Sequence, residues 1–141
     1  MDFEVSVDID AEREAVWAVL IDVEHWPRWT SSMQSVLRVG HDPLAVGSEV
    51  RVKQPKLAAS RWRITELDPP RSFSWVSHSA GVTTVADHEL ADHGGATRAT
   101  LRLRQSGRLA PVIALLAGSL IRRYVRLEAD GLKRECETAS R

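Results

Sequence analysis

The fold of this chain is decided by the stretch Val16–Trp29, which reads VWAVLIDVEHWPRW. Its first half repeats apolar residues at steps of three and four, the spacing of a one-faced amphipathic helix. Pro27 then ends regular helix and leaves room for one short helical piece. Three of the five tryptophans of the chain lie in this stretch. Because exposed surface has little use for so much aromatic area, these rings are expected to cover something.

Strands are expected on both sides of this stretch. Phe3–Ile9 alternates apolar and polar residues, and Asp10 after it is the expected N-cap of the helix. Six further alternating segments predict strands at Val36–Val39, Gly47–Gln54, Trp62–Glu66, Phe73–His78, Val82–Leu90 and Ala99–Gln105. A long helix is expected from Pro111 to about Glu137, with Gly131 as a weak point inside it.

This order predicts an α+β architecture in one domain over residues 1–141. Hairpin spacing between the strands indicates an antiparallel sheet, and one apolar face per strand indicates one covered face. Only the final helix is long enough to cover that face. We therefore expect a curved sheet of six or seven strands wrapped around a long C-terminal helix, with two short helices after the first strand.

Composition excludes several classes of function. The chain carries 19 basic and 19 acidic residues, so it offers no strong basic field for nucleic acid. Its single cysteine, Cys136, allows neither an internal disulfide nor a multi-cysteine metal site. No motif for a nucleotide, a metal or a serine nucleophile is present, so we expect no cofactor and no metal. The N-terminus has no signal-peptide pattern, which together with the lone cysteine predicts a cytoplasmic protein.

The longest apolar run, Leu109–Ile121, is too short to cross a bilayer. Its length favours a core helix, so membrane contact is not expected. The flanking Arg108, Arg122 and Arg123 leave an interfacial helix as the alternative.

The order of elements resembles the START-like, helix-grip superfamily, also called SRPBCC. The local motifs are most similar to its polyketide cyclase/dehydrase and lipid-transport branch. They are Val16-Trp17, Asp22, Trp26-Pro27 and Trp29, then Val46-Gly47-Ser48, Leu67–Arg71, Phe73-x-Trp75 and Glu128–Leu132. The resemblance spans about Phe3 to Cys136. It implies a cavity between the sheet and the last helix, while ligands and activities differ widely within the family.

His88 is the candidate catalytic residue. In the triplet Asp87-His88-Glu89, strand alternation turns His88 to the inner face and its two neighbours outward. Two readings stay open, a core histidine satisfied by a neighbour and a cavity group that binds a ligand or moves protons. Inner-face polar residues and aromatic rings are expected to line the same cavity, with Trp26 and Trp29 at its mouth. The full set of expected ligand-binding residues is Trp26, Trp29, Gln54, Trp62, Trp75, Thr84, His88, Leu103, Leu116, Leu120 and Tyr124.

The expected function is therefore binding of a small hydrophobic or aromatic molecule, lipid-like or polyketide-like, in that cavity. One alternative is a cyclase or dehydratase in which His88 with Tyr124 or Glu66 moves protons. A weaker alternative is a protein that docks on a membrane or another subunit through Leu109–Ile121. The sequence leaves the oligomeric state open, a homodimer included.

Overall fold

A computed structural model describes residues 1–79 and 81–139 of the chain. The elements follow in the order β1 (Asp2–Ile9), α1 (Arg13–Ile21), the 3₁₀ helix η1 (Val23–Arg28), β2 (Ser35–Arg38), β3 (Glu49–Lys53), β4 (Ser60–Asp68), β5 (Ser72–Ser79), β6 (Val82–His93), β7 (Ala96–Ser106) and α2 (Ala110–Ala139). The strands form a seven-stranded sheet in the order β1-β7-β6-β5-β4-β3-β2, with every neighbouring pair antiparallel.

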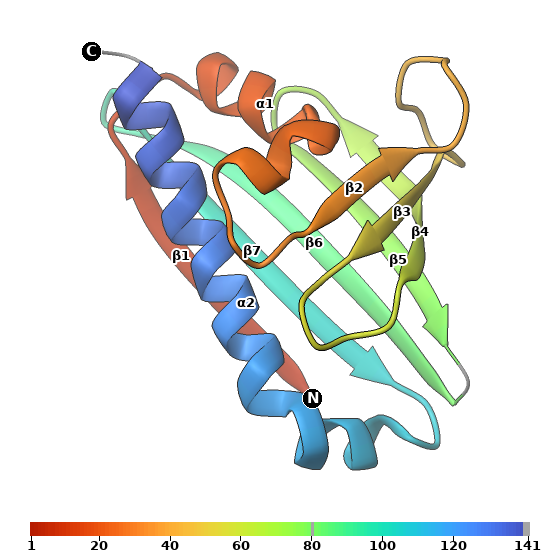
Figure 1. Cartoon of the computed structure of the whole chain (residues 1–141). Helices are drawn as coiled ribbons and strands as arrows, with labels where there is room; N and C mark the ends of the chain where they lie inside the picture. Colours follow the sequence, from red (N-terminus) through yellow and green to blue (C-terminus); the bar gives the residue numbers. More distant parts are fainter. Residues whose placement is uncertain (80, 140–141) are drawn as a thin grey trace.

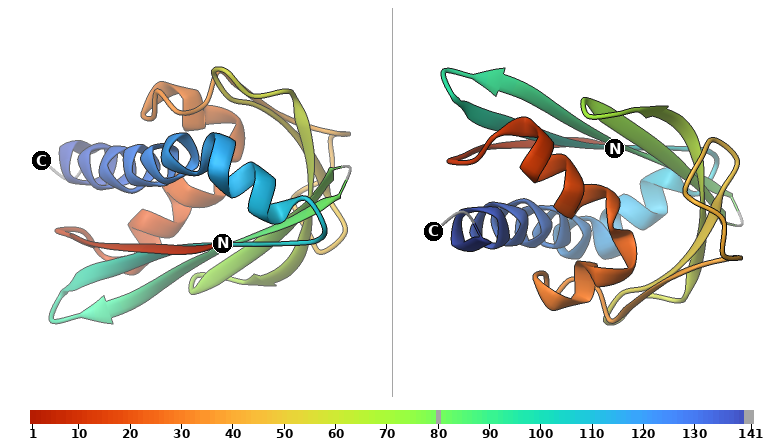
Figure 2. Two further views of the ribbon diagram at one scale, coloured as in Figure 1. Left: turned by 90° about the horizontal axis from the view of Figure 1, so that it is seen from below. Right: turned by 90° about the horizontal axis from the view of Figure 1, so that it is seen from above.

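The sheet curves around α2, as the end-on views of Figure 2 show. The long helix lies across the concave side of the sheet, while α1 and η1 cover one end of it (Figure 1). This is the predicted helix-grip architecture, an α+β fold with two short helices after the first strand. The β6–β7 hairpin turns through Gly94 and Gly95, both at positive φ, as a tight hairpin turn requires.

Two local expectations are wrong. The N-cap of α1 is Glu12, which makes no side-chain cap hydrogen bond. Asp10 does not cap α1, and its backbone N–H instead donates to the Glu137 carboxylate at the far end of α2 (2.9 Å). In β4 the register with β5 shifts between Ile64 and Glu66. A bulge of this kind inverts the alternation, so Glu66 is exposed and cannot be the proton-transfer partner of His88 that the enzyme alternative allowed.

The helix pair and α2 meet at a glycine. A Cβ on Gly131 would lie 2.2 Å from the Trp29 carbonyl oxygen, closer than any side-chain atom can approach. Gly131 therefore lets the loop after η1 pack directly on the α2 backbone. The helix continues through Gly131 without a break to Ala139. The glycine expected to weaken α2 is therefore the position at which the loop packs on the helix.

The beginning of α2 is not core, contrary to the preferred reading of the Leu109–Ile121 run. Leu115 is 85% exposed and Leu116 is 77% exposed. The reason is geometric, because this end of α2 extends past the start of β1 (Figure 1). Met1 lies beside Gly118, so the helix residues before Gly118 extend beyond the start of the edge strand β1; Ala110 is buried there, while Leu115 and Leu116 face solvent.

The outer face of the sheet carries paired charges. Arg98 binds Asp8 (2.9 Å) and Arg104 binds Asp87 (3.1 Å). Arg102 contacts Glu4 at 2.8 Å. These pairs make the outer face a charged surface, which discourages edge-to-edge association of sheets.

Candidate ligand-binding site

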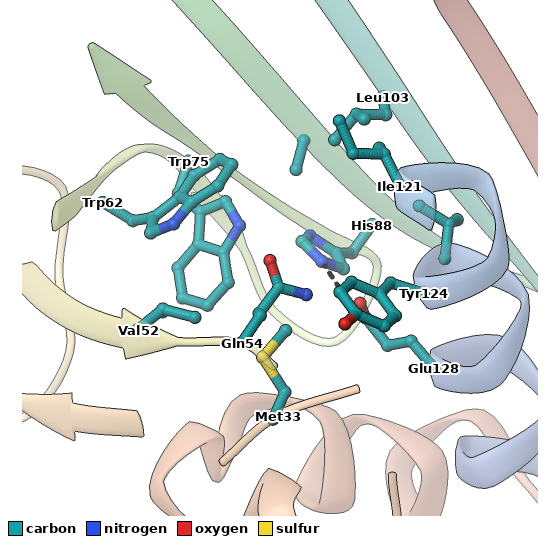
Figure 3. A pocket seen from close by; sticks show the side chains of 12 residues that line it. Met33, Val52, Gln54, Trp62, Trp75, His88, Leu103, Ile121, Tyr124 and Glu128 are labelled. Atoms are coloured by element: carbon teal, nitrogen blue, oxygen red, sulfur yellow. Dashed lines mark ion pairs between the residues drawn. The ribbon is translucent and has the colours of Figure 1, made fainter. Parts of the chain in front are cut away.

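A cavity of about 60 Å³ lies between the concave face of the sheet and the middle of α2. It is lined by Met33, Val52, Gln54, Trp62, Trp75, Ala86, His88, Leu103, Ile121, Tyr124, Val125 and Glu128. Figure 3 shows Trp62 and Trp75 on one side and Tyr124 and Glu128, from α2, on the other. The lining is therefore mostly apolar and aromatic, with polar groups concentrated near the helix.

His88 is held in an aromatic box. The antiparallel register of β5 and β6 places His88 opposite Phe73, and the two rings stack with centroids 4.1 Å apart. Trp26 and Trp75 contact the same imidazole, with centroids 5.6 Å and 5.7 Å from it. Rings on three sides fix the orientation of the imidazole and keep water away from it.

The two ring nitrogens of His88 have different partners. Its Nδ1–H donates to the Phe73 carbonyl (3.2 Å), since a carbonyl can only accept. Nε2 faces Oε1 of Glu128 at 3.4 Å, and both side chains are buried. Imidazole and carboxyl groups both exchange protons, so the pair has the chemistry to give a proton to a ligand oxygen or to take one from it.

A second contact joins α2 to the loop between β3 and β4. The hydroxyl of Tyr124 donates to the backbone carbonyl of Pro55, and the adjacent Gln54 lines the cavity. Figure 3 shows Gln54 and Tyr124 close to the His88–Glu128 pair. The tyrosine hydroxyl is thereby committed to the protein backbone, while the ring of Tyr124 forms the cavity wall.

The structure brings together part of the expected site. The expected residues that line the cavity are Gln54, Trp62, Trp75, His88, Leu103 and Tyr124. The other expected residues lie outside the lining, namely Trp26, Trp29, Thr84, Leu116 and Leu120.

The two tryptophans expected at the cavity mouth are core residues instead. Trp26 is fully buried, donates its indole N–H to the Leu20 carbonyl (2.8 Å) and packs on His88. Trp29 is buried against Gly131. Both rings therefore support the cavity from behind its lining.

The other three residues lie outside the cavity lining because of their positions along β6 and α2. Thr84 lies near the beginning of β6 and accepts a hydrogen bond from Gln105 (3.4 Å), near the end of β7. Leu116 is exposed on the projecting end of α2, and Leu120 is half-buried one turn further along the helix.

Glu128 is the functional candidate that sequence reasoning missed. In the sequence it stands out only as part of the Glu128–Leu132 motif. A signal for its role exists, because Glu128 follows Tyr124 by four residues and therefore shares its helix face. A carboxylate on the inner face of a helix needs a partner, and His88 is an inward-facing titratable group of the sheet.

Residues 1–79 and 81–139 contain no group of three or more His, Cys, Asp or Glu side chains that could hold a metal ion. None of the helices in these residues combines the length and the hydropathy that a membrane span requires.

The family is settled by sequence. The pattern of the family described as "Polyketide cyclase / dehydrase and lipid transport" matches residues 1–137. The chain belongs to this family. A comparison with curated proteins finds no match. Membership confirms the resemblance noted in the sequence and is consistent with binding of hydrophobic ligands or with cyclase-type chemistry.

Solved structures agree on the fold of this family member. A protein from Thermus thermophilus, TTHA0849, superposes with a TM-score of 0.80 at 18% identity, over 100% of both chains. The ZhuI aromatase/cyclase from Streptomyces sp. R1128 gives 0.79 at 19% identity, over 100% of this chain and 96% of that one. A START superfamily protein from Mycobacterium smegmatis gives 0.77 at 14% identity, over 98% of each. At these identities the likeness establishes the helix-grip fold alone.

Proposed function

We propose that this protein is a single START-like domain that binds a small hydrophobic or aromatic molecule in the cavity between sheet and α2. The observation that carries this proposal is the cavity itself, where Trp62 and Trp75 lie opposite a buried His88–Glu128 pair. An apolar pocket with a few convergent polar groups is the usual form of a small-molecule site. The cytoplasm is the compartment we propose for it.

The cavity limits the kind of ligand. Pockets that hold drug-sized molecules measure roughly 300–1,000 Å³, against about 60 Å³ here. A cavity that binds one benzene measures about 150 Å³, so a flat ring, or the end of a lipid-like or polyketide-like chain, enters only when the wall moves outward. The contact between Tyr124 and Pro55 is a polar contact that would break as the wall opens.

The polar groups indicate what the ligand carries. His88 and Glu128 place polar atoms at the cavity surface, in apolar surroundings where an unpaired polar group is costly. A hydroxyl or carbonyl on the ligand would hydrogen-bond to this pair, while stacking on Trp62 and Trp75 would supply most of the binding free energy. The favoured ligand is therefore an aromatic or lipid-like molecule with one such oxygen.

Calorimetric titration with 2-naphthol tests the proposal. We expect saturable binding, weakened at least tenfold by Trp62→Ala, because the variant loses both stacking and apolar burial. Trp17→Ala is the matched control, since Trp17 is also half-buried but packs on Phe73 away from the cavity lining. Absence of binding, or equal weakening in the two variants, would overturn the proposal. Mass spectrometry of the natively purified protein would identify a carried ligand.

The second candidate is a cyclase or dehydratase, which the His88–Glu128 pair favours. In an aldol closure the pair would take a proton from the carbon between two carbonyls. That carbon would form the new bond to the carbon of the fourth carbonyl, closing a six-membered ring, and the proton would go to the oxygen of that carbonyl as its C=O π bond breaks. Turnover of a 1,3,5,7-tetraketone, lost in His88→Gln with affinity retained, would support this candidate. If the wild type did not turn over such a ketone, ligand binding would be the only function supported.

A further inference from the structure

The exposed end of α2 carries an apolar surface that the cavity does not use. This apolar tip consists of Leu109, Val112, Leu115 and Leu116. All four side chains are at least 45% exposed, on a helix end that extends past the start of β1 (Figure 1). Scattered exposed leucines need no explanation, but four on one projecting helix end form a patch.

The same face of α2 becomes basic further along the helix. From Val112 onward, exposed residues recur at steps of three and four, which places them on one stripe of the helix. The stripe consists of Val112, Leu115, Leu116, Ser119, Arg122, Arg123 and Arg126. The two arginines Arg122 and Arg123 follow Leu115 and Leu116 by seven residues, or roughly 10 Å along the axis.

The arginines of this stripe differ from those of the sheet. Arg98, Arg102 and Arg104 each bind a carboxylate. Within the described part of the chain, no carboxylate lies at ion-pair distance from Arg108 or from the three arginines of the stripe. Arg108, Arg122, Arg123 and Arg126 therefore leave this end of an otherwise neutral protein with uncompensated positive charge.

We propose that the apolar tip and its arginines bind the surface of a membrane that contains anionic lipids. The leucines would enter the boundary between headgroups and acyl chains, which interfacial helices penetrate by roughly 5–10 Å. At about 10 Å behind the tip, Arg122 and Arg123 would meet the phosphates. A second copy of the chain is a poorer occupant, because an isologous contact through this stripe would add a second set of arginines and no carboxylate from the stripe to pair with them. This surface is separate from the cavity, so the proposal stands apart from ligand binding.

Vesicle co-sedimentation tests this proposal on the full chain. At low salt, we expect binding to vesicles of 70% phosphatidylcholine and 30% phosphatidylglycerol, and little binding to phosphatidylcholine alone. Arg122→Gln with Arg123→Gln should lower the partition coefficient about 25-fold, or about fivefold per arginine. Leu115→Ser with Leu116→Ser should lower it at least tenfold. Added salt at 0.5 M should release the wild type, since the charges are exposed.

Two matched controls distinguish binding through this surface from non-specific adsorption to vesicles. Leu37→Ser with Val46→Ser removes two other exposed apolar side chains, and Arg51→Gln with Arg63→Gln removes two exposed arginines of the sheet. Both controls should bind vesicles as the wild type does. No binding to the anionic vesicles, or equal loss in controls and test variants, would overturn the proposal. Sedimentation of the wild type as a dimer that Leu115→Ser with Leu116→Ser dissociates would also overturn it, in favour of self-association.

Discussion

Nε2 of His88 and Oε1 of Glu128 lie 3.4 Å apart, joining the middle of the sheet to the middle of α2 inside a buried aromatic box. The two residues are 40 positions apart in the chain, so only the packing of α2 on the sheet brings them together. Their pairing gives a largely apolar cavity one polar end. That asymmetry makes the orientation of a bound molecule testable.

Replacing Glu128 by Gln should weaken the binding of 2-naphthol about fivefold and leave naphthalene unaffected. Hydrogen bonds to a charged group are about twice as strong as neutral ones, so the variant loses part of one polar interaction and little volume. Calorimetric titration of both ligands measures the difference. Glu135→Gln, on the same helix but outside the cavity lining, should change neither affinity. An equal loss for both ligands would show that Glu128 acts through packing alone.

Replacing Gly131 by Ala should lower the thermal stability, although alanine is the better helix former by about 1 kcal/mol. The new Cβ would meet the Trp29 carbonyl oxygen at 2.2 Å, so the loop or the helix must move. Overpacking of this kind costs about 1–3 kcal/mol. Thermal unfolding followed by circular dichroism measures the effect.

Gly118→Ala is the control, on the same helix. Its nearest neighbour would be the flexible Met1 side chain at 3.4 Å, so the helix preference of alanine should raise the melting temperature slightly. A rise in both variants would contradict the close contact at Gly131.

Stability should fall in acid through Glu24, among other carboxylates. The backbone N–H and then the guanidinium of Arg38 donate to Glu24 and lower the pKa of this carboxyl below its usual 4.5. Because the folded protein has the lower pKa, the stabilisation is present above pH 4.5 and is lost as the pH falls through the folded value. Urea unfolding from pH 6 to pH 3 should therefore show a stability gap between the wild type and Glu24→Gln that narrows in acid. Glu14→Gln, at an exposed position of α1, should give no such gap.

Cys136 should resist thiol reagents in the folded protein. Burial, with a smaller contribution from Glu135 and Glu137, raises the pKa of this thiol to about 12. At pH 8 only about one molecule in ten thousand would carry the reactive thiolate. Ellman's reagent should react slowly with the native protein and quickly after unfolding in guanidinium chloride. Rapid reaction of the native protein would contradict the buried position.

The fold was predictable because its signals are local. Alternation along Phe3–Ile9 and the later strands reports which face is covered, and the apolar stripe of Val16–Val23 reports a helix. The bulge in β4 was not predictable, because a one-residue register shift leaves no mark in hydropathy. It moved Glu66 from the expected inner face to solvent.

The site was predictable only in its sheet half. Strand alternation identified Trp62, Trp75 and His88 as inward-facing, and all three line the cavity. The helix half depends on how far α2 slides along the sheet, which helical periodicity does not report. Leu116 therefore lies beyond the sheet and Glu128 lies in the cavity, although both belong to one regular helix.

The continuity of α2 has a mechanical consequence. The 30-residue helix is a single rod of about 45 Å, with the cavity wall at its middle and the apolar tip at one end. The close contact between Gly131 and Trp29 is the point about which α2 could tilt. A tilt of about 10° there would swing Leu116 by about 4 Å and Tyr124 by about 2 Å, for a rise of about 1.5 Å per residue. A force on the apolar tip would thus strain the hydrogen bond between the Tyr124 hydroxyl and the Pro55 carbonyl, and its loss would open the cavity wall.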